Sequence, residues 1–249
     1  MENKKTEIDI ILPNYNSFEF IDKTIQSVLN QNLTNWNLII IDDFSNIETK
    51  KKIKKYEKLK KIKIYWLKKN RGAAYCRNFA ISKSKSKYIA FIDSDDLWKK
   101  NKLRLQLEYM KKNKYDFTYT YYETFGIKSS KIVPPTKFHF ESFIKNTSIA
   151  TSTMMIKRKA AKSIKFTNTA ICEDYHFKCK ILKKVKFAYC LKKFLTKYRI
   201  RQNSLQSNKF KNFFWIWIIN HKYNRLTFFE NLNSLLNISL NSIKKYGLK

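Results

Sequence analysis

The stretch "KYIAFIDSDD" (87–96) runs from apolar residues directly into three carboxylates, Asp93, Asp95 and Asp96. The chain has 249 residues with 52 basic against 19 acidic side chains, so acid is scarce elsewhere. Neighbouring carboxylates repel each other unless a cation or hydrogen bonds offset the repulsion. The cluster therefore indicates either a cation site at a strand end or the N-terminal cap of a helix starting near Leu97. A cap needs only one carboxylate, and this favours the cation site.

Strands and helices alternate around this stretch. Apolar runs predict strands at 8–13, 36–43, 62–67 and 88–93, and helical spacing predicts helices at 20–31, 45–59 (opened by a capping box at 45–48), 73–81 and 97–112. This rhythm predicts an α/β fold with a mainly parallel sheet flanked by helices. Each strand is followed by a polar motif: "PNYN", "DDFS", "NRG" and "DSDD". Because ligands bind beyond the carboxyl ends of such strands, these motifs predict one site.

The pattern changes after about residue 115. Extended segments are expected at 115–125, 150–158 and 193–201, with helices in 133–146 and 173–184 and two more in 207–246. There is no internal repeat and no flexible linker. We expect one compact unit with three parts: a nucleotide-binding half (1–125), a second half (126–206) and a helical C-terminal tail (207–249).

The formal net charge of +33 raises the question of an anionic partner. The basic residues are 45 Lys and only 7 Arg, scattered along the chain. Nucleic-acid readout favours the bidentate fork of arginine, so this pattern argues against a nucleic-acid partner. Two explanations stay open: a compositional drift towards lysine, and attraction to an anionic membrane surface.

The cysteines and the apolar runs bear on the compartment. Four cysteines occur without CxxC spacing, and there are three histidines, which argues against a structural zinc site and for a reduced, cytoplasmic chain. No signal peptide is visible, and the run "FFWIWII" (213–219) is too short to span a bilayer. The sequence predicts a soluble or peripheral protein.

Two acidic strand ends carry candidate chemistry. In "IDSDD", Asp93 and Asp95 form a D-x-D pair whose oxygens suit Mg²⁺ or Mn²⁺ shared with a diphosphate. In "IIIDDFS", Asp42 and Asp43 can accept hydrogen bonds from a nucleobase or ribose, or can cap a helix.

The order of motifs is more specific than any single one. "ILPNYN", "IIIDDFSN", "NRGAAYCRNFAI", "YIAFIDSDDLW" and "CEDYHFKCKIL" occur in the order and rough spacing of family-2 glycosyltransferases. The chain resembles members that build bacterial cell-surface polysaccharides, and it is similar to the teichuronic-acid biosynthesis type. "KYDFTYTYYE", "KYRIRQNSLQSNK" and the terminal "IKKYG" extend the resemblance over nearly the whole chain.

This resemblance implies a GT-A fold and an inverting hexosyl transfer from a nucleotide-diphosphate sugar, expected to be a UDP-sugar, with Mn²⁺ or Mg²⁺ as cofactor. The acceptor would be a saccharide or lipid-linked saccharide, and the enzyme would work in the cytoplasm or peripherally at the inner face of the membrane. Asp174 matches the catalytic base, and Asp95, with Asp96 beside it, the metal ligand. The expected nucleotide-sugar contacts are Pro13, Tyr15, Asn16, Asp42, Asp43, Asn70, Gly72, Arg77, Asn78, Asp93 (near the ribose), Ser94 and Arg201.

Two positions depart from the family pattern. Phe44 stands where a glycine is usual, so the turn is expected to avoid a positive φ. Arg201 stands where histidine is common, and it could contact the diphosphate or simply face solvent. Two other functions are alternatives. A pyrophosphorylase-like enzyme would need a glycine-rich phosphate loop that "PNYNSFEF" lacks, and a basic, non-enzymatic nucleic-acid binder follows from charge alone.

Overall fold

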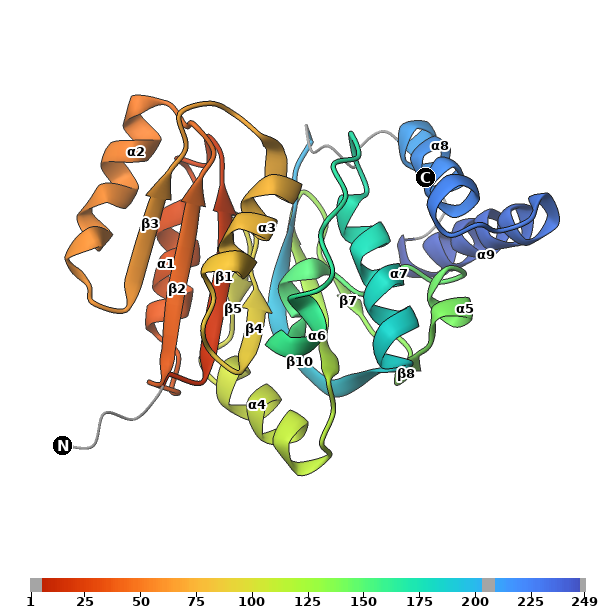
Figure 1. Cartoon of the computed structure of the whole chain (residues 1–249), viewed down its shortest axis with the longest axis horizontal. Helices are drawn as coiled ribbons and strands as arrows, with labels where there is room; N and C mark the ends of the chain where they lie inside the picture. The colour runs from red at the N-terminus through yellow and green to blue at the C-terminus, as the bar shows by residue number, and fades with distance from the viewer. Residues whose placement is uncertain (1–5, 203–208, 247–249) are drawn as a thin grey trace.

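The computed structural model describes residues 6–202 and 209–246, and it begins with the expected alternation of strands and helices (Figure 1). The elements of this first half are β1 (Ile8–Asn14), α1 (Ile21–Leu29), β2 (Trp36–Asp42), α2 (Ile47–Lys54), the 3₁₀ turn η1 (Lys55–Lys58), β3 (Ile62–Trp66), α3 (Gly72–Lys83) and β4 (Tyr88–Phe91). The four predicted strands and the first three predicted helices are confirmed.

The second half adds shorter strands and a helical end. Its elements are β5 (Leu97–Trp98), α4 (Lys102–Lys112), β6 (Phe117–Gly126), β7 (Ser130–Ile132), β8 (Lys137–Phe138), α5 (Phe140–Phe143), the 3₁₀ turn η2 (Thr151–Thr153), β9 (Met155–Lys157), α6 (Arg158–Ala161), α7 (Glu173–Val185), β10 (Ala188–Ile200), α8 (Lys209–Ile218), the π-helical turn η3 (Ile219–Tyr223) and α9 (Phe228–Tyr246). The predicted tail helices correspond to α8 and α9. The expected boundary at 206/207 and part of "KYRIRQNSLQSNK" lie outside the described residues.

One sheet joins both halves of the chain. Its main path has the order β3-β2-β1-β4-β9-β6-β10-β5. The strands β3, β2, β1 and β4 are parallel, β9 is antiparallel to β4 and to β6, and β10 runs parallel to β6. Because β9 pairs with β4 and β10 pairs with β6, strands from both sides of the expected boundary at 125/126 share one hydrogen-bonded sheet. The carboxyl ends of the parallel strands meet at one edge, as the sequence predicts.

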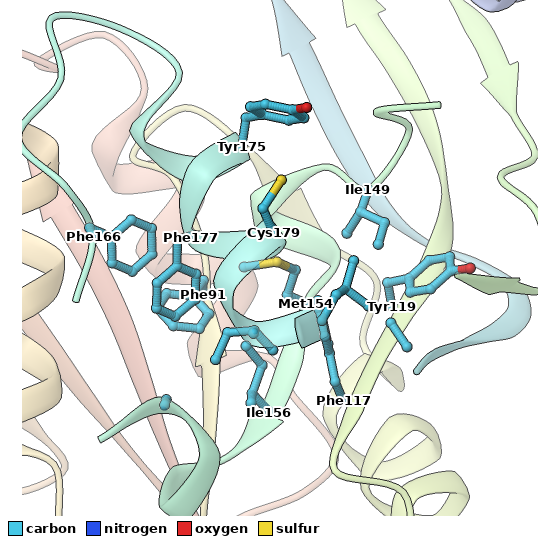
Figure 2. Close-up of a cluster of buried hydrophobic side chains, with 14 of the residues drawn as sticks. Phe91, Phe117, Tyr119, Ile149, Met154, Ile156, Phe166, Tyr175, Phe177 and Cys179 are labelled. Atoms are coloured by element: carbon cyan, nitrogen blue, oxygen red, sulfur yellow. The ribbon is translucent and has the colours of Figure 1, made fainter. Parts of the chain in front are cut away.

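Apolar side chains cover both faces of the sheet because the parallel strands are apolar on both sides. Ile8, Ile10 and Leu12 face a core shared with α1 and α4, while Ile11 and Ile41 face a core shared with α3 and α7. Figure 2 shows part of the second core, which fixes α7 against the sheet. There Phe177 of α7 stacks on Phe166 at a ring-centroid distance of 3.8 Å, and Phe91 of β4 meets both rings edge-on.

Three local predictions are wrong. The helix expected at 97–112 begins only at Lys102, because residues 97–98 form β5 and pair with β10. The cap of α2 is Asn46, whose side chain accepts a hydrogen bond from the Thr49 amide, and the expected 45–48 capping box is not formed. The strand expected at 150–158 is split into η2 and the short β9.

Candidate active site

The ends of β1 and β2 are joined by a buried hydrogen-bond network around Asp42. Asn14 donates its side-chain amide to Asp42 Oδ1 at 2.8 Å, and the Ser45 amide donates to Asp42 Oδ2 at 3.0 Å. Asp42 is fully buried. Its carboxylate therefore holds the two loops together, and both of its oxygens are used within the chain.

Asp43 instead joins the β2 loop to the start of α3. Its carboxylate accepts hydrogen bonds from the amides of Arg71 at 2.7 Å and Gly72 at 2.8 Å. Gly72 has φ +82°, a backbone conformation that glycine adopts without steric cost. Asn70 donates to the Asp43 carbonyl at 3.3 Å. Hydrogen bonds thus join the predicted residues Asp43, Asn70 and Gly72, which come from two separate loops.

The loop after β1 presents Tyr15 to solvent. Tyr15 follows Pro13 and Asn14 at the carboxyl end of β1 and is 53% exposed. The next residue, Asn16, is held at φ +45° by hydrogen bonds between its own amide and Ser45 Oγ and between the Asn46 amide and its side-chain oxygen. The rigid backbone leaves the Tyr15 ring available to a ligand.

Phe44 adopts the positive φ that its side chain was expected to exclude. Its φ is +64°, in the left-handed region where residues with a Cβ are strained. The prediction that this turn avoids a positive φ is wrong. The fixed positions of Asp42 and Asp43 on one side and Ser45 on the other impose the conformation, and the Phe44 ring lies exposed under the ammonium group of Lys50.

A pocket of about 430 Å³ opens beside the start of α3. Its lining is polar and basic, and it consists of Lys69, Asn70, Arg71, Ala74, Tyr75, Asn78 and Asn168. Arg71 covers the Tyr75 ring at 3.9 Å. The side chain of Asn78 exchanges two hydrogen bonds with the backbone of Phe166, at 2.7 and 2.8 Å, so it shapes the wall of this pocket.

The three acids of "DSDD" have different environments. Asp95 Oδ2 accepts a hydrogen bond from Arg201 Nε at 2.9 Å. Asp96 is buried, and its two oxygens accept from the Arg199 amide at 2.8 Å and from Ser152 Oγ at 2.5 Å. The alternative reading of Asp96 as a helix cap is wrong, since α4 begins six residues later. Asp96 instead holds the acidic loop against β10 and η2.

Burial, together with charge repulsion inside the cluster, raises the pKa of Asp95 and of Asp96. Burial raises the pKa of Asp95, and the charge of Asp93 raises it further, against the opposing effect of Arg201. Burial also raises the pKa of Asp96 well above its usual range, together with the charges of Asp95 and Asp93. The charged forms of Asp95 and Asp96 are therefore disfavoured in the protein alone, and a bound cation would favour them. The Ser94 carbonyl accepts a hydrogen bond from Thr24 Oγ1 at 3.0 Å, which fixes the loop between the acids.

Arg77 connects the acidic loop to α7. Its guanidinium donates to Asp93 Oδ1 at 2.7 Å and to Glu173 Oε1 at 2.8 Å, and its side chain is 6% exposed. Glu173 therefore does more than place a negative charge at the N-terminus of α7, because it shares the Arg77 guanidinium with Asp93. One buried cation draws together two acidic segments that lie 80 residues apart in sequence, which places the start of α7 beside the loop of Asp93 and Asp95.

Asp174 lies at the start of α7 with both carboxylate oxygens hydrogen-bonded. Oδ2 accepts from Lys178 Nζ at 2.6 Å and from Thr151 Oγ1 at 2.9 Å, and Oδ1 accepts from the Tyr175 amide at 2.8 Å. Burial acts to raise the pKa of Asp174, but Lys178, Arg77 and Thr151 together outweigh it and lower the pKa to about 2. Asp174 is an ionised carboxylate at any physiological pH.

Three residues of this site were not singled out from the sequence. Thr151 and Ser152 of η2 contact Asp174 and Asp96 respectively, so this turn links the acidic loop to the start of α7. Lys178 could have been found, because it lies four residues after Asp174, the spacing at which helical side chains meet. Thr151 and Ser152 have no comparable local signal.

The acidic loop offers carboxylates as candidate metal ligands. Within residues 6–202 and 209–246, no three or more histidine, cysteine, aspartate or glutamate side chains are arranged to hold a metal ion by themselves. Mg²⁺ and Mn²⁺ are commonly held by one or two carboxylates, with phosphate and water oxygens completing the shell. The partly exposed Asp95, with Asp93 and Asp96 beside it, fits that kind of site.

A comparison with known proteins identifies the family. The model of Glycosyl transferase family 2 matches residues 9–185, more than half of the chain. A Bacillus subtilis protein named as a teichuronic acid biosynthesis glycosyltransferase, TuaG, is 34% identical over 250 residues, which cover 98% of this chain and 99% of the relative. The chain therefore belongs to glycosyltransferase family 2 and is a glycosyltransferase, which displaces the pyrophosphorylase and nucleic-acid alternatives.

A second relative and a solved structure also resemble this chain over most of its length. The Escherichia coli protein WfgD, named as a UDP-Glc:alpha-D-GlcNAc-diphosphoundecaprenol beta-1,3-glucosyltransferase, is 36% identical over 207 residues, or 82% of this chain and 81% of the relative. The crystal structure of S. aureus TarS 1-349 in complex with UDP-GlcNAc aligns with a TM-score of 0.75 at 18% identity, covering 96% of this chain and 73% of that chain. The expected GT-A fold is confirmed.

Proposed function

We propose that this glycosyltransferase moves a sugar from a UDP-sugar to a hydroxyl of a saccharide or lipid-linked saccharide, with inversion, during surface polysaccharide synthesis. One observation carries the proposal: Arg77 holds Asp93 of the acidic loop and Glu173 at the start of α7 within 2.8 Å of one guanidinium. This brings Asp174, which follows Glu173, to the neighbourhood of Asp95. The carboxylate that would hold the metal at the leaving diphosphate and the carboxylate that would take the proton of the acceptor hydroxyl thus come from separate segments.

The donor side is assigned to the strand ends of the first half. In the proposal Pro13, Tyr15 and Asn16 line the nucleotide pocket, and Asp42 and Asp43 shape it through the turns they hold. Asn70, Gly72, Arg77 and Asn78 build the neighbouring wall around α3, while Asp93 and Ser94 lie at the ribose. Two names support a uridine nucleotide: the aligned TarS structure contains UDP-GlcNAc, and WfgD is named for a UDP-Glc donor.

Asp95 is the proposed ligand for Mn²⁺ or Mg²⁺. A bound divalent ion would stabilise the charge that the leaving diphosphate gains as the glycosidic bond breaks. Asp96 lay beside Asp95 in the expected metal site, but its two oxygens are engaged by Arg199 and Ser152, so we assign it to supporting the loop. Arg201 is close enough to Asp95 to contact the diphosphate as well. A Mn²⁺ complex of a fold neighbour, the Pyrobaculum calidifontis mannosyltransferase PcManGT, is in line with such a site.

Asp174 is the proposed base. The acceptor oxygen attacks the anomeric carbon, the bond from that carbon to the diphosphate oxygen breaks, and the proton of the acceptor hydroxyl passes to Asp174. Attack opposite the leaving group inverts the anomeric centre. A positioned carboxylate of this kind contributes about 10²–10⁴-fold to such a step. The half formed by residues 126–206, which contains Asp174, would then bind the acceptor, and residues 1–125 the donor.

The acceptor and the compartment follow from the relatives and the cysteines. WfgD is named for a diphosphoundecaprenol-linked acceptor, and this supports a lipid-linked saccharide here. All four cysteines are free and buried, as expected in a reducing compartment. Among the described residues no helix is both long enough and apolar enough to cross a membrane. We therefore place the enzyme in the cytoplasm, in peripheral contact with the inner face of the membrane.

Thermal unfolding in the presence of UDP and Mn²⁺ tests the donor and metal assignments. We expect UDP with Mn²⁺ to raise the melting temperature of the wild type, and Asp95→Ala to remove most of that rise. Asp22→Ala, which removes a partly exposed aspartate on α1 outside the site, is the matched control and should respond like the wild type. Equal stabilisation of wild type and Asp95→Ala would overturn the metal assignment.

Asp174→Asn tests the base. The variant should keep the donor-induced rise in melting temperature and lose about 10²–10⁴-fold in transfer rate. Because the substitution leaves Lys178 buried without its partner, Asp174→Asn with Lys178→Met is a second variant in which no charge is left uncompensated. Transfer at the wild-type rate in either variant would remove Asp174 from the mechanism.

A further inference from the structure

The outer face of α9 carries a continuous row of exposed apolar side chains. Five of them are 42–80% exposed, and we call this row the apolar stripe: Phe229, Leu232, Leu236, Leu240 and Ile243. At 3.6 residues per turn these positions fall within roughly a quarter of the helix circumference and extend over about 20 Å. Single exposed apolar residues are ordinary, but a stripe of this length marks an interaction surface.

The opposite face of α9 is already committed to the protein interior. Asn231, Ser234 and Ile238 are buried there, and Ser234 donates a hydrogen bond to the Ile144 carbonyl at 2.6 Å. Asn220 of η3 donates to Asn231 at 3.2 Å and to Ser234 at 3.0 Å. These buried hydrogen bonds fix the rotation of α9, so the apolar stripe faces away from the core by construction.

Aromatic side chains extend the surface at the joint of the two helices. Phe228 contacts Trp217 of α8 and Phe229 with ring-centroid distances of 5.5 and 5.7 Å. Phe210 and Phe214, one turn apart on α8, are 89% and 60% exposed. Figure 1 shows α8 and α9 beside α7, at the end of the molecule opposite α2. Both helices of the tail therefore expose apolar surface at one end of the protein.

The charges around this surface are almost all positive. Residues 209–249 contain seven Lys or Arg and one acid, Glu230. Lys222 and Arg225 between the helices and Lys244 at the end of α9 are exposed. Amphipathic helices with an apolar stripe bordered by basic residues bind in the interfacial region of anionic bilayers.

We propose that the outer surface of α8 and α9, centred on the apolar stripe, docks on an anionic lipid bilayer. The alternative occupant of such a stripe is a second copy of the chain. Each copy has a formal charge of +33, so association of two copies brings like charges together, whereas an anionic lipid surface carries the opposite charge. Charge complementarity therefore selects the bilayer.

Hydrogen bonds connect the docking surface to α7, the helix that carries Asp174. Tyr175, the next residue, donates its hydroxyl proton to Asn220 Oδ1 at 2.7 Å, and Asn220 in turn holds α9. Docking of the stripe would thus set the distance of the start of α7 from the lipid surface. The inference deepens the proposed function and rests on it for the lipid-linked acceptor, so lipid binding and donor binding are to be measured separately.

Vesicle flotation with the full chain tests the docking surface. We expect the wild type to float with phosphatidylglycerol-containing vesicles and not with pure phosphatidylcholine vesicles. Leu236→Ser with Leu240→Ser should lower the bound fraction at least tenfold at the same lipid concentration. Ile47→Ser with Leu59→Ser is the matched control, because it removes two exposed apolar residues near the other end of the molecule, and it should bind like the wild type.

Four outcomes would overturn the inference: no flotation of the wild type, equal flotation with neutral vesicles, equal binding by the stripe variant, or a concentration-dependent dimer in light scattering that the stripe variant abolishes. The rise in melting temperature with UDP and Mn²⁺, measured on the same samples, shows that the variants are folded. If that rise is absent in the wild type while flotation is present, the donor assignment fails and the lipid surface stands.

Discussion

Lys178 Nζ lies 2.6 Å from Oδ2 of Asp174, one turn away along α7; the Lys178 side chain is buried and the Asp174 side chain is 17% exposed. A buried ammonium group at this distance stabilises the charged form of the carboxylate strongly. Thr151 on η2, Arg77 on α3 and Glu173 on the same helix are the other polar or charged groups near it. The ion pair therefore keeps Asp174 ionised, and the same lowering of its pKa makes it a weaker base.

Lys178→Met should change the pH dependence of transfer. Without the ammonium group, burial dominates and the pKa of Asp174 rises from its value of about 2. The acid limb of kcat/KM should move to higher pH than in the wild type. The measurement is the pH profile of donor turnover between about pH 4.5 and 8.

Lys184→Met is the control for that profile, because Lys184 lies near the other end of α7 from Asp174. An acid limb unchanged in Lys178→Met would show that Lys178 does not act on the base.

The ion pair between Lys178 and Asp174 also predicts that acid destabilises the fold, which urea unfolding at a series of low pH values measures. Because the folded pKa of Asp174 is depressed, its stabilising contribution is complete above the usual value of 3.8 and is lost as the pH falls through about 2.

Phe44→Gly and Phe44→Ala should reverse their usual order of stability. Alanine is normally the more stabilising residue, because glycine has more freedom in the unfolded chain. At φ +64° a Cβ is strained, so glycine should give the more stable protein here, by about 1 kcal/mol. Urea unfolding of the two variants measures the difference. An alanine variant as stable as the glycine variant would show that this turn is not strained.

The sheet and its polar edge could be predicted because their signals are local. Apolar strands such as 36–42 and helices such as 21–29 are defined by their own periodicity, and polar motifs at the strand ends must meet once the strands are parallel. The position of α4 could not be predicted in this way. Residues 97–98 pair with β10, which lies about a hundred residues later in the chain.

The functions of individual acids also depended on distant contacts. The three acids of "DSDD" are the same residue type in one short loop, yet each has a different partner. Asp93 pairs with Arg77, and Asp95 pairs with Arg201. Asp96 accepts a hydrogen bond from Ser152. Ser152 lies in a 3₁₀ turn without any motif, so its link to Asp96 has no signature in sequence. The positive φ of Phe44 was missed for a related reason, since the loops on both sides of it impose a conformation that its own residue type disfavours.

Arg77→Met should be among the most destabilising single changes in the site. The substitution leaves Asp93 and Glu173 without their shared cation in a partly buried position, and losing one partner of such a pair costs about 3–5 kcal/mol. Lys55→Met removes the exposed ion pair with Asp22 and should cost less than about 1 kcal/mol. Urea unfolding of both variants gives the comparison, and similar losses would contradict a bridging role for Arg77.

Lys102 is a fully buried lysine whose removal should stabilise the protein. It lies at the start of α4, donates to Gln106 at 2.8 Å, and lies over the Trp98 ring at 4.1 Å. Burial lowers its pKa from 10.5 to about 7. The unfolded chain binds this proton more tightly, so stability falls as the pH drops from about 10.5 to about 7 and this effect is constant at lower pH.

Lys102→Met should therefore raise the free energy of unfolding at pH 7, by up to about 4 kcal/mol, the upper end found when buried ion pairs are replaced by apolar side chains of similar size. It should also flatten the dependence of stability on pH between about 7 and 10, which is the stronger test because a simple packing gain would not change that slope. Lys112→Met, at the exposed end of the same helix, should change neither quantity. If urea unfolding shows the same pH slope in Lys102→Met and wild type, Lys102 does not titrate within the fold.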